Sequence, residues 1–208
     1  MPTPRIVLEA DAGEREMIED MRSDAAMNRV FAVAHASYQT DRLMPAIQAV
    51  LAEAKDLLPR NPSASVVWSV QALEFFIKNG VIEPALKFRL GFDPGLANSI
   101  FDKMFSGPGS LTGSREWFKK ILGTSLQAHL AEIGRPNLWT SLWPTKRMKG
   151  RDRDRRPRKS IIEWRNDIVH HAYVADNEEA RLALQAVAEF IEVSAEFLRS
   201  ARQHGSAT

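Results

Sequence analysis

Apolar residues recur every three or four positions along most of this chain, and this spacing predicts amphipathic helices. A capping box formed by Asp11 and Glu14 predicts the start of a first helix, which extends to about residue 38. A second apolar stripe between residues 43 and 58 has regular helical spacing. We expect this second helix to end near Pro59, since proline disfavours helical continuation.

The third predicted helix is apolar around most of its circumference. Asn61 followed by Pro62 is a typical N-cap and first-turn pair, and Gly80 is a typical stop signal. A helix without a polar face must be buried on most sides, so we expect this one to be central. Polar positions within it, such as Glu74, then require a partner or a functional reason.

The pattern breaks into shorter pieces in the region 91–159, which we interpret as an insertion. One helix is predicted to begin at Ser114 and to end at the Gly-Arg-Pro sequence around residue 135. Trp139 and Trp143 follow in an apolar stretch. They are candidates either for stacking on bases or for an apolar lid, and we favour the lid.

Two capping boxes predict the last two helices. Ser160 with Glu163 opens the first, and Asp176 with Glu179 opens the second. We expect the tail after Arg199 to be frayed. The sequence therefore predicts an all-α helical bundle, with a long, partly helical insertion before the penultimate helix.

Composition narrows the class of protein. The hydrophobic share of 44% and charged share of 26% are those of a globular chain, and we expect one domain over residues 1–208. Cysteine is absent, which excludes disulfides, thiolate zinc sites and cysteine nucleophiles. The N-terminus lacks the apolar core of a signal peptide, and no run approaches the roughly 20 apolar residues of a membrane span. We expect a cytoplasmic protein without a membrane partner.

Charge is distributed unevenly. Between residues 146 and 159 there are nine basic and two acidic residues, a net charge of +7 within a chain whose total is +2. The remainder therefore carries −5. A basic loop at 145–159 on an otherwise acidic chain predicts polyanion binding, and a solvated charge run is the alternative. The candidate RNA-binding residues in this loop are Lys149, Arg151, Arg153, Arg155, Arg156 and Arg158.

The penultimate helix carries the sequence Glu-Trp-Arg-Asn-Asp-Ile-Val-His-His from residue 163 to residue 171. An arginine followed after four residues by histidine, with a polar residue just after the arginine, resembles the signature of the HEPN superfamily. Arg165, Asn166 and His170 occupy those positions. Arg199 and His204 have the same spacing in the tail. The capped helix start and the following helix are what select Arg165.

The resemblance covers residues 41–90 and 160–200 and implies a HEPN-like bundle. It also implies a supporting role for Glu74, which would orient Arg165. An ion pair between Glu74 and Lys78, one helical turn further on, is an equally weighted alternative. Without the family context, Arg165 would be read as a surface salt bridge and His170 as a buried imidazole.

Helix geometry is compatible with a joint site. At about 100° per residue, Asn166 and His170 lie about 40° apart, and Arg165 lies about 140° from His170, a gap that its long side chain can bridge. His171 lies about 100° from His170, so we expect it to face elsewhere and keep it as an alternate.

The resemblance implies a metal-independent endoribonuclease that cleaves single-stranded or loop RNA by attack of the 2′-hydroxyl, with no cofactor. Histidine would transfer protons and arginine would stabilise the phosphorane. The family typically forms a homodimer with a composite site. A toxin or antiphage defence effector is the implied role, and a cognate antitoxin or regulatory protein is a candidate partner. The alternatives are a catalytically inactive HEPN module that binds RNA, a nucleotide or a partner protein, and a purely structural helical adaptor.

Overall fold

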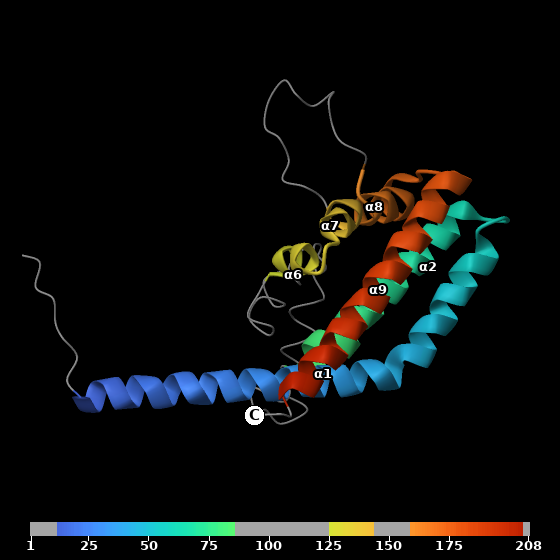
Figure 1. Ribbon diagram of the computed structural model, residues 1–208. Coiled ribbons are helices and arrows are strands. Elements are labelled where there is room, and N and C mark those ends of the chain that lie inside the picture. The colour runs from blue at the N-terminus through green and yellow to red at the C-terminus, as the bar shows by residue number, and fades with distance from the viewer. Residues whose placement is uncertain (1–11, 86–124, 144–158, 206–208) are drawn as a thin grey trace, which may run out of the picture.

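The computed structural model describes residues 12–85, 125–143 and 159–205, with side chains in 32–85, 125–143 and 159–203 (Figure 1). Within these ranges the chain is helical between short connections, without a strand, which confirms the all-α class. No described helix combines the length and apolar character that a membrane crossing requires. The helices are α1 (Ala12–Leu57), α2 (Pro62–Phe75), the π-helix η1 (Phe76–Ile82), α6 (Leu126–Glu132), α7 (Pro136–Leu142), α8 (Ile161–His171) and α9 (Asn177–Gly205).

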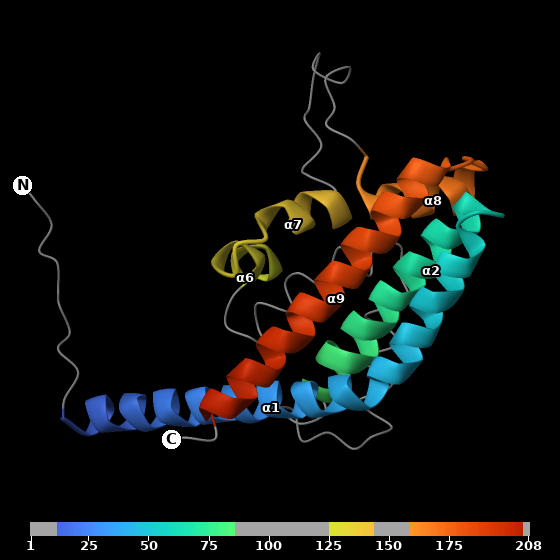
Figure 2. The ribbon, with the colours of Figure 1, turned by 45° about the vertical axis from the view of Figure 1, so that its right-hand side comes forward.

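The two helices expected before Pro59 are one continuous helix, α1. Pro45 lies inside it, and α1 changes direction sharply in its second half (Figures 1 and 2). Proline removes a backbone donor and crowds the preceding turn, which bends a helix. Thr40 and Asp41, which interrupt the apolar pattern, have partners on other helices: Thr40 bonds to Gly80, and Asp41 pairs with Arg199.

The third predicted helix begins as expected, because the Asn61 side chain accepts a hydrogen bond from the Ala64 amide at 3.1 Å. Gly80 does not end it, however. The chain continues through Gly80 as the π-helix η1. The Thr40 hydroxyl donates to the Gly80 carbonyl at 3.1 Å, and a Cβ at Gly80 would lie 3.1 Å from that hydroxyl oxygen. Glycine therefore serves here for the close approach of α1.

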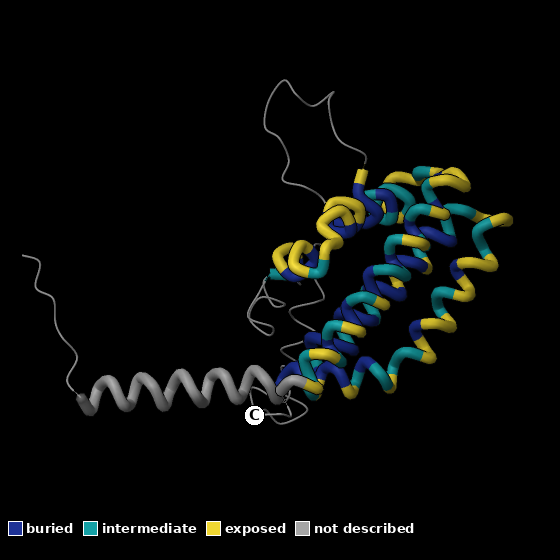
Figure 3. Tube along the Cα trace, viewed as in Figure 1, coloured by how far each residue is buried: buried dark blue, intermediate teal, exposed yellow. Residues whose placement is uncertain are grey.

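The second half of α1, the α2–η1 helix and α9 lie side by side, and α8 packs on α2 (Figures 1 and 2). Buried positions gather on the facing sides of α2 and α9 (Figure 3). Phe76 of η1 meets Phe190 of α9 edge to face, with ring centroids 6.2 Å apart. Such pairs add to the stabilisation that apolar burial provides.

Helices α6 and α7 show that part of the insertion belongs to the core. The chain enters α6 in extended backbone at Ser125, whose side chain caps the helix at Leu126, so the helix expected from Ser114 does not run continuously to residue 132. Residues 86–124 lie outside the described part. Trp139 of α7 stacks on Trp143, the residue that follows this helix, with centroids 4.9 Å apart. Both indoles are buried, so they pack in the interior and do not form a stacking platform.

The end of α9 also differs from the expectation. A frayed tail was expected after Arg199, but the helix continues to Gly205. Arg199 and Arg202 both bind Asp41 of α1, with nitrogen–oxygen distances of 3.1 and 3.3 Å. A carboxylate shared by two arginines on successive turns favours the helical geometry that places both in reach.

Candidate functional site

Helix α8 carries the candidate residues, and its start follows from local chemistry. The Ser160 hydroxyl accepts from the Glu163 amide at 3.3 Å, and the Glu163 carboxylate accepts from the Ser160 amide at 2.9 Å. This capping box is the one predicted from the sequence. The helix ends at Ala172, which adopts left-handed backbone with φ of 52°. Eleven residues are thus held between two defined ends.

One face of α8 packs inward through Ile161, Ile162 and Trp164, all buried. Ile168 is partly buried against the same core, whereas residues 169–171 are exposed. Arg165 lies on the α2 side, half-buried, whereas His170 lies in the last turn and is exposed. The helix thus separates a structural face from a polar face.

Arg165 is held by two partners. Its Nη2 lies 3.6 Å from Oε1 of Glu74 on α2, and its Nη1 donates to Oδ1 of Asn166 at 3.0 Å. The side chains of Arg165 and Glu74 are 28% and 26% exposed, so the pair borders solvent. Guanidinium has five N–H donors, and these contacts leave donors available for a phosphate.

His170 completes the predicted set by position and not by contact. It lies one turn beyond Asn166 on the same helix, and its side chain forms no hydrogen bond or ion pair with the described residues. The structure therefore brings together Arg165, Asn166 and Glu74, with an exposed imidazole nearby on α8.

A second polar cluster, centred on Asp167, was not identified from the sequence. Its Oδ2 accepts from Nζ of Lys159 at 2.9 Å, and its Oδ1 lies 3.1 Å from Nδ1 of His171. The hydrogen bond from Lys159 is the main cause that lowers the pKa of Asp167, and the contact with His171 adds to it. The i, i+4 spacing of Asp167 and His171 is the local signal that could have revealed the pair.

Tyr173 borders this cluster. Its hydroxyl donates to both carboxylate oxygens of Glu179, at 2.7 and 2.9 Å. These bonds stabilise the protonated phenol and raise the pKa of Tyr173 to about 12. Glu179 also forms the predicted capping box of α9 with Asp176. The Lys159 amine lies 4.9 Å from the centre of the Tyr173 ring, so the connection from α8 to α9 is tied to the Asp167 cluster.

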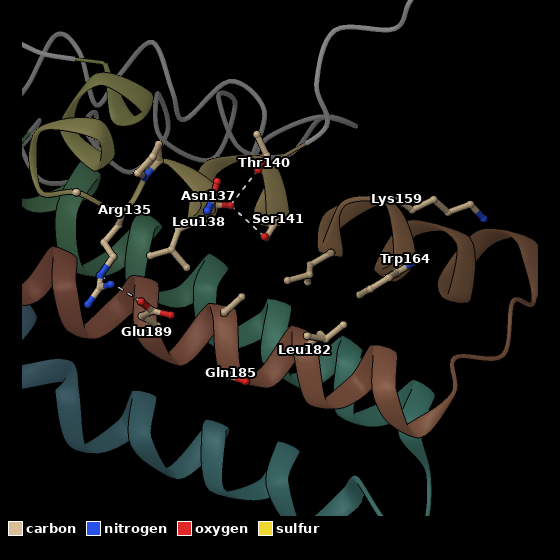
Figure 4. Close-up of a pocket in the computed structure, with 14 residues that line it drawn as sticks. Arg135, Asn137, Leu138, Thr140, Ser141, Lys159, Trp164, Leu182, Gln185 and Glu189 are labelled. Atoms are coloured by element: carbon tan, nitrogen blue, oxygen red, sulfur yellow. Dashed lines mark hydrogen bonds and ion pairs between the residues drawn. The ribbon is translucent and has the colours of Figure 1, made fainter. Parts of the chain in front are cut away.

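A groove of about 560 Å³ lies between α7, the start of α8 and α9. Figure 4 shows an ion pair of Arg135 with Glu189 at one end, at 3.3 Å, and Trp164 at the other. Lys159 also lines this end, but its amine points away from the groove (Figure 4). Arg165 and its partners Glu74 and Asn166 do not line this groove.

The predicted basic loop lies almost wholly outside the residues that the structure describes. Residues 144–158 lie outside the described residues, and they include all six candidate RNA-binding side chains, Lys149, Arg151, Arg153, Arg155, Arg156 and Arg158. Lys159, the last basic residue of the segment, is described and binds Asp167. In the described ranges, no three histidine or carboxylate side chains are grouped as a set of metal ligands.

Comparisons with known proteins return nothing for this chain: no family model, no curated protein and no solved structure matches it.

Proposed function

We propose that this protein is a HEPN-type endoribonuclease. It cleaves single-stranded or loop RNA by attack of the RNA's own 2′-hydroxyl on the neighbouring phosphate. The observation that carries the proposal is the placement of Arg165, which Glu74 and Asn166 hold at the border of solvent on the helix that presents His170. A guanidinium fixed by two partners is suited to a dianionic phosphorane, because its remaining donors need little reordering when charge develops.

The chemistry requires only groups that this chain carries. Cleavage by the 2′-hydroxyl needs removal of one proton, donation of another to the 5′-oxygen, and stabilisation of the phosphorane. His170 is a proton-transfer group in this scheme, and Arg165 binds the phosphate. The reaction leaves a 2′,3′-cyclic phosphate and a 5′-hydroxyl, and it calls for no metal ion.

We further propose that the protein acts as a homodimer whose two α8 helices face each other. The family resemblance suggests this arrangement, and two exposed apolar side chains support it: Trp68 on α2, 41% exposed, and Val169 on α8, 50% exposed. Large apolar side chains that are exposed on an isolated protomer often mark a protein interface. RNA cleavage by a toxin or defence effector, restrained by a cognate antitoxin or regulatory protein, is the proposed biological role.

The basic loop at 145–159 is the proposed RNA-docking element. Lysine and arginine that neutralise phosphates release bound counterions, so binding through this loop must weaken as salt rises. Neutralising Arg151, Arg153, Arg155 and Arg156 should weaken RNA binding and flatten its dependence on salt concentration. An unchanged salt slope would assign the segment to a solvated linker.

The decisive experiment incubates purified protein and the variant His170→Ala with mixed cellular RNA in excess chelator, and then analyses the product ends. We expect cyclic-phosphate ends from the natural chain and at least a hundredfold loss in the variant. Size-exclusion chromatography with light scattering provides the control that the variant keeps its fold and oligomeric state. Intact RNA with the natural protein would contradict the ribonuclease proposal.

The groove favours a second candidate function, a non-catalytic module that binds RNA, a nucleotide or a partner protein. Its lining mixes the Trp164 ring with the amide side chains of Asn137 and Gln185, a combination that suits a heterocyclic ligand. In that case, Gln185→Ala should weaken ligand binding measured by calorimetry, and His170→Ala should not.

A further inference from the structure

The proposed ribonuclease needs two proton-transfer groups, and the last turn of α8 presents two histidines in succession. His170 and His171 are both exposed, and the His171 side chain is 71% exposed. They lie about 100° apart around the helix axis at nearly the same height. The sequence alone suggested that His171 faces elsewhere. In the structure, both side chains are exposed in the last turn of the helix, and His171 turns toward Asp167, four residues earlier.

The contact with Asp167 determines how His171 carries its proton. Asp167 is ionised, because the hydrogen bond from Lys159 lowers its pKa. A carboxylate can only accept hydrogen bonds, so the 3.1 Å contact requires a proton on Nδ1 of His171. In the neutral ring Nε2 is then the unprotonated nitrogen. The basic lone pair of His171 is thereby assigned to the nitrogen that Asp167 does not contact.

Asp167 is itself fixed from two sides. One oxygen binds Lys159 and the other binds His171, so the carboxylate has a defined orientation. Lys159 in turn lies over the Tyr173 ring. These contacts make Asp167 a positioning residue, since it acts through the imidazole that it holds.

We propose that His171, held by Asp167, is the general base of the ribonuclease site, and that His170 of the same protomer is the general acid. The inference rests on the proposed function and refines it, because it supplies both proton-transfer groups from one chain. The partner protomer then serves for RNA binding and stability and does not donate the missing histidine.

Nε2 of His171 takes the proton of the 2′-hydroxyl while the 2′-oxygen forms a bond to phosphorus. The bond from phosphorus to the 5′-oxygen breaks, and that oxygen takes a proton from the imidazolium form of His170. The products are a 2′,3′-cyclic phosphate and a 5′-hydroxyl. Exchange with water restores both rings, and no electron transfer or further reactant is involved.

A change of leaving group separates the two roles. A nucleoside 3′-(4-nitrophenyl phosphate) releases a stable phenolate, which needs no proton from a general acid, yet it still needs a base at the 2′-hydroxyl. We would use the four nucleoside compounds together with RNA as substrates. His170→Ala should lose about a hundredfold on RNA and only a few-fold on the activated compounds. His171→Ala should lose about a hundredfold on both.

The Asp167 contact is tested by nitrogen NMR of the histidine ring and by Asp167→Asn. We expect the Nδ1–H form of His171 in the natural chain, and in the variant a smaller share of that form with roughly tenfold slower cleavage. Glu178→Gln is the matched control, since it removes a surface ion pair of similar spacing with Arg181 on α9. His171→Gln, which keeps a polar side chain, guards against loss of folding.

The outcomes are distinct. Normal cleavage by His171→Ala, or recovery of this variant on the activated compounds, overturns the inference while the ribonuclease stands. An Nε2–H ring at His171 overturns the role of Asp167. A natural chain that cleaves neither RNA nor the activated compounds overturns the proposed function itself, and the inference with it.

Discussion

Two histidine environments in this protein differ in almost every physical respect. His129 on α6 is fully buried, and its ring centre lies 3.8 Å from that of Phe197 on α9. His171 at the end of α8 is largely exposed and is oriented by a carboxylate. Burial penalises the charged form of an imidazole, whereas exposure beside an anion permits it. The interior histidine is therefore coupled to stability, and the histidines of α8 can reach a substrate.

The largest effect on the free energy of unfolding should follow the removal of a buried aromatic ring from the core. Trp143 is almost fully buried and meets Phe190 at 5.3 Å, so Trp143→Ala should lower the free energy of unfolding by about 3–5 kcal/mol. Val174→Ala, at a side chain that is 79% exposed between α8 and α9, is the control and should cost less than about 1 kcal/mol. Urea denaturation measures both. Equal losses would show that α7 is not part of the core.

The next effect is the loss of folding stability at acidic pH. Burial lowers the pKa of His129 from 6.5 to about 4, so between these values the unfolded chain binds a proton that the folded chain refuses. Stability is then fully present above pH 6.5, and it falls by roughly 3 kcal/mol as the pH drops to about 4. His129→Leu should remove this part of the acid sensitivity. Urea denaturation at a series of pH values tests it, and parallel curves for both proteins would contradict the assignment.

A smaller effect is expected at Glu74, which holds Arg165 from α2. Glu74→Gln keeps the shape but removes the charge, so we expect roughly tenfold slower RNA cleavage, about 1.4 kcal/mol in the barrier. The loss should lie in kcat with little change in KM, because Arg165 is then less well ordered in the transition state. Glu178→Gln again serves as the control. A purely structural role would lower stability and leave the kinetics of the folded fraction unchanged.

The smallest effect concerns the start of α8. Ser160→Ala removes the hydroxyl that caps the Glu163 amide and should cost about 1 kcal/mol of unfolding free energy. Thr140→Ala, which removes an exposed hydroxyl bonded within α7, should change stability by less than about 0.5 kcal/mol. Thermal unfolding distinguishes the two, and an unaffected Ser160 variant would show that packing alone holds the start of α8.

Features with partners close in sequence could be predicted from the sequence. Asn61, Ser160 and Asp176 were each identified as helix starts, and each bonds to a group three residues away. The Asp167–His171 contact is equally local, and its i, i+4 spacing can be recognised in the sequence. The arginine–histidine motif places its imidazole at His170, so it does not point to this pair.

Features with distant partners could not be predicted in this way. The polar stretch around Thr40 suggested the end of a helix, yet α1 continues because Gly80 and Arg199 bind Thr40 and Asp41 from 40 and 158 residues away. Gly80 suggested a helix stop, but the contact with Thr40 accompanies a continuous π-helix there. The free energy lost to unfavourable local propensity is smaller than the free energy gained from burial and hydrogen bonding in the tertiary structure.

The sequence by itself determined the all-α class, the capped start of α8 and the order of Arg165, Asn166 and His170 along that helix. Only the tertiary structure decided that Glu74 approaches Arg165, that Trp143 lies in the core and that the two α8 histidines open to solvent. The reason is physical: caps depend on neighbouring backbone groups, whereas burial and ion pairs between helices depend on how whole apolar faces pack.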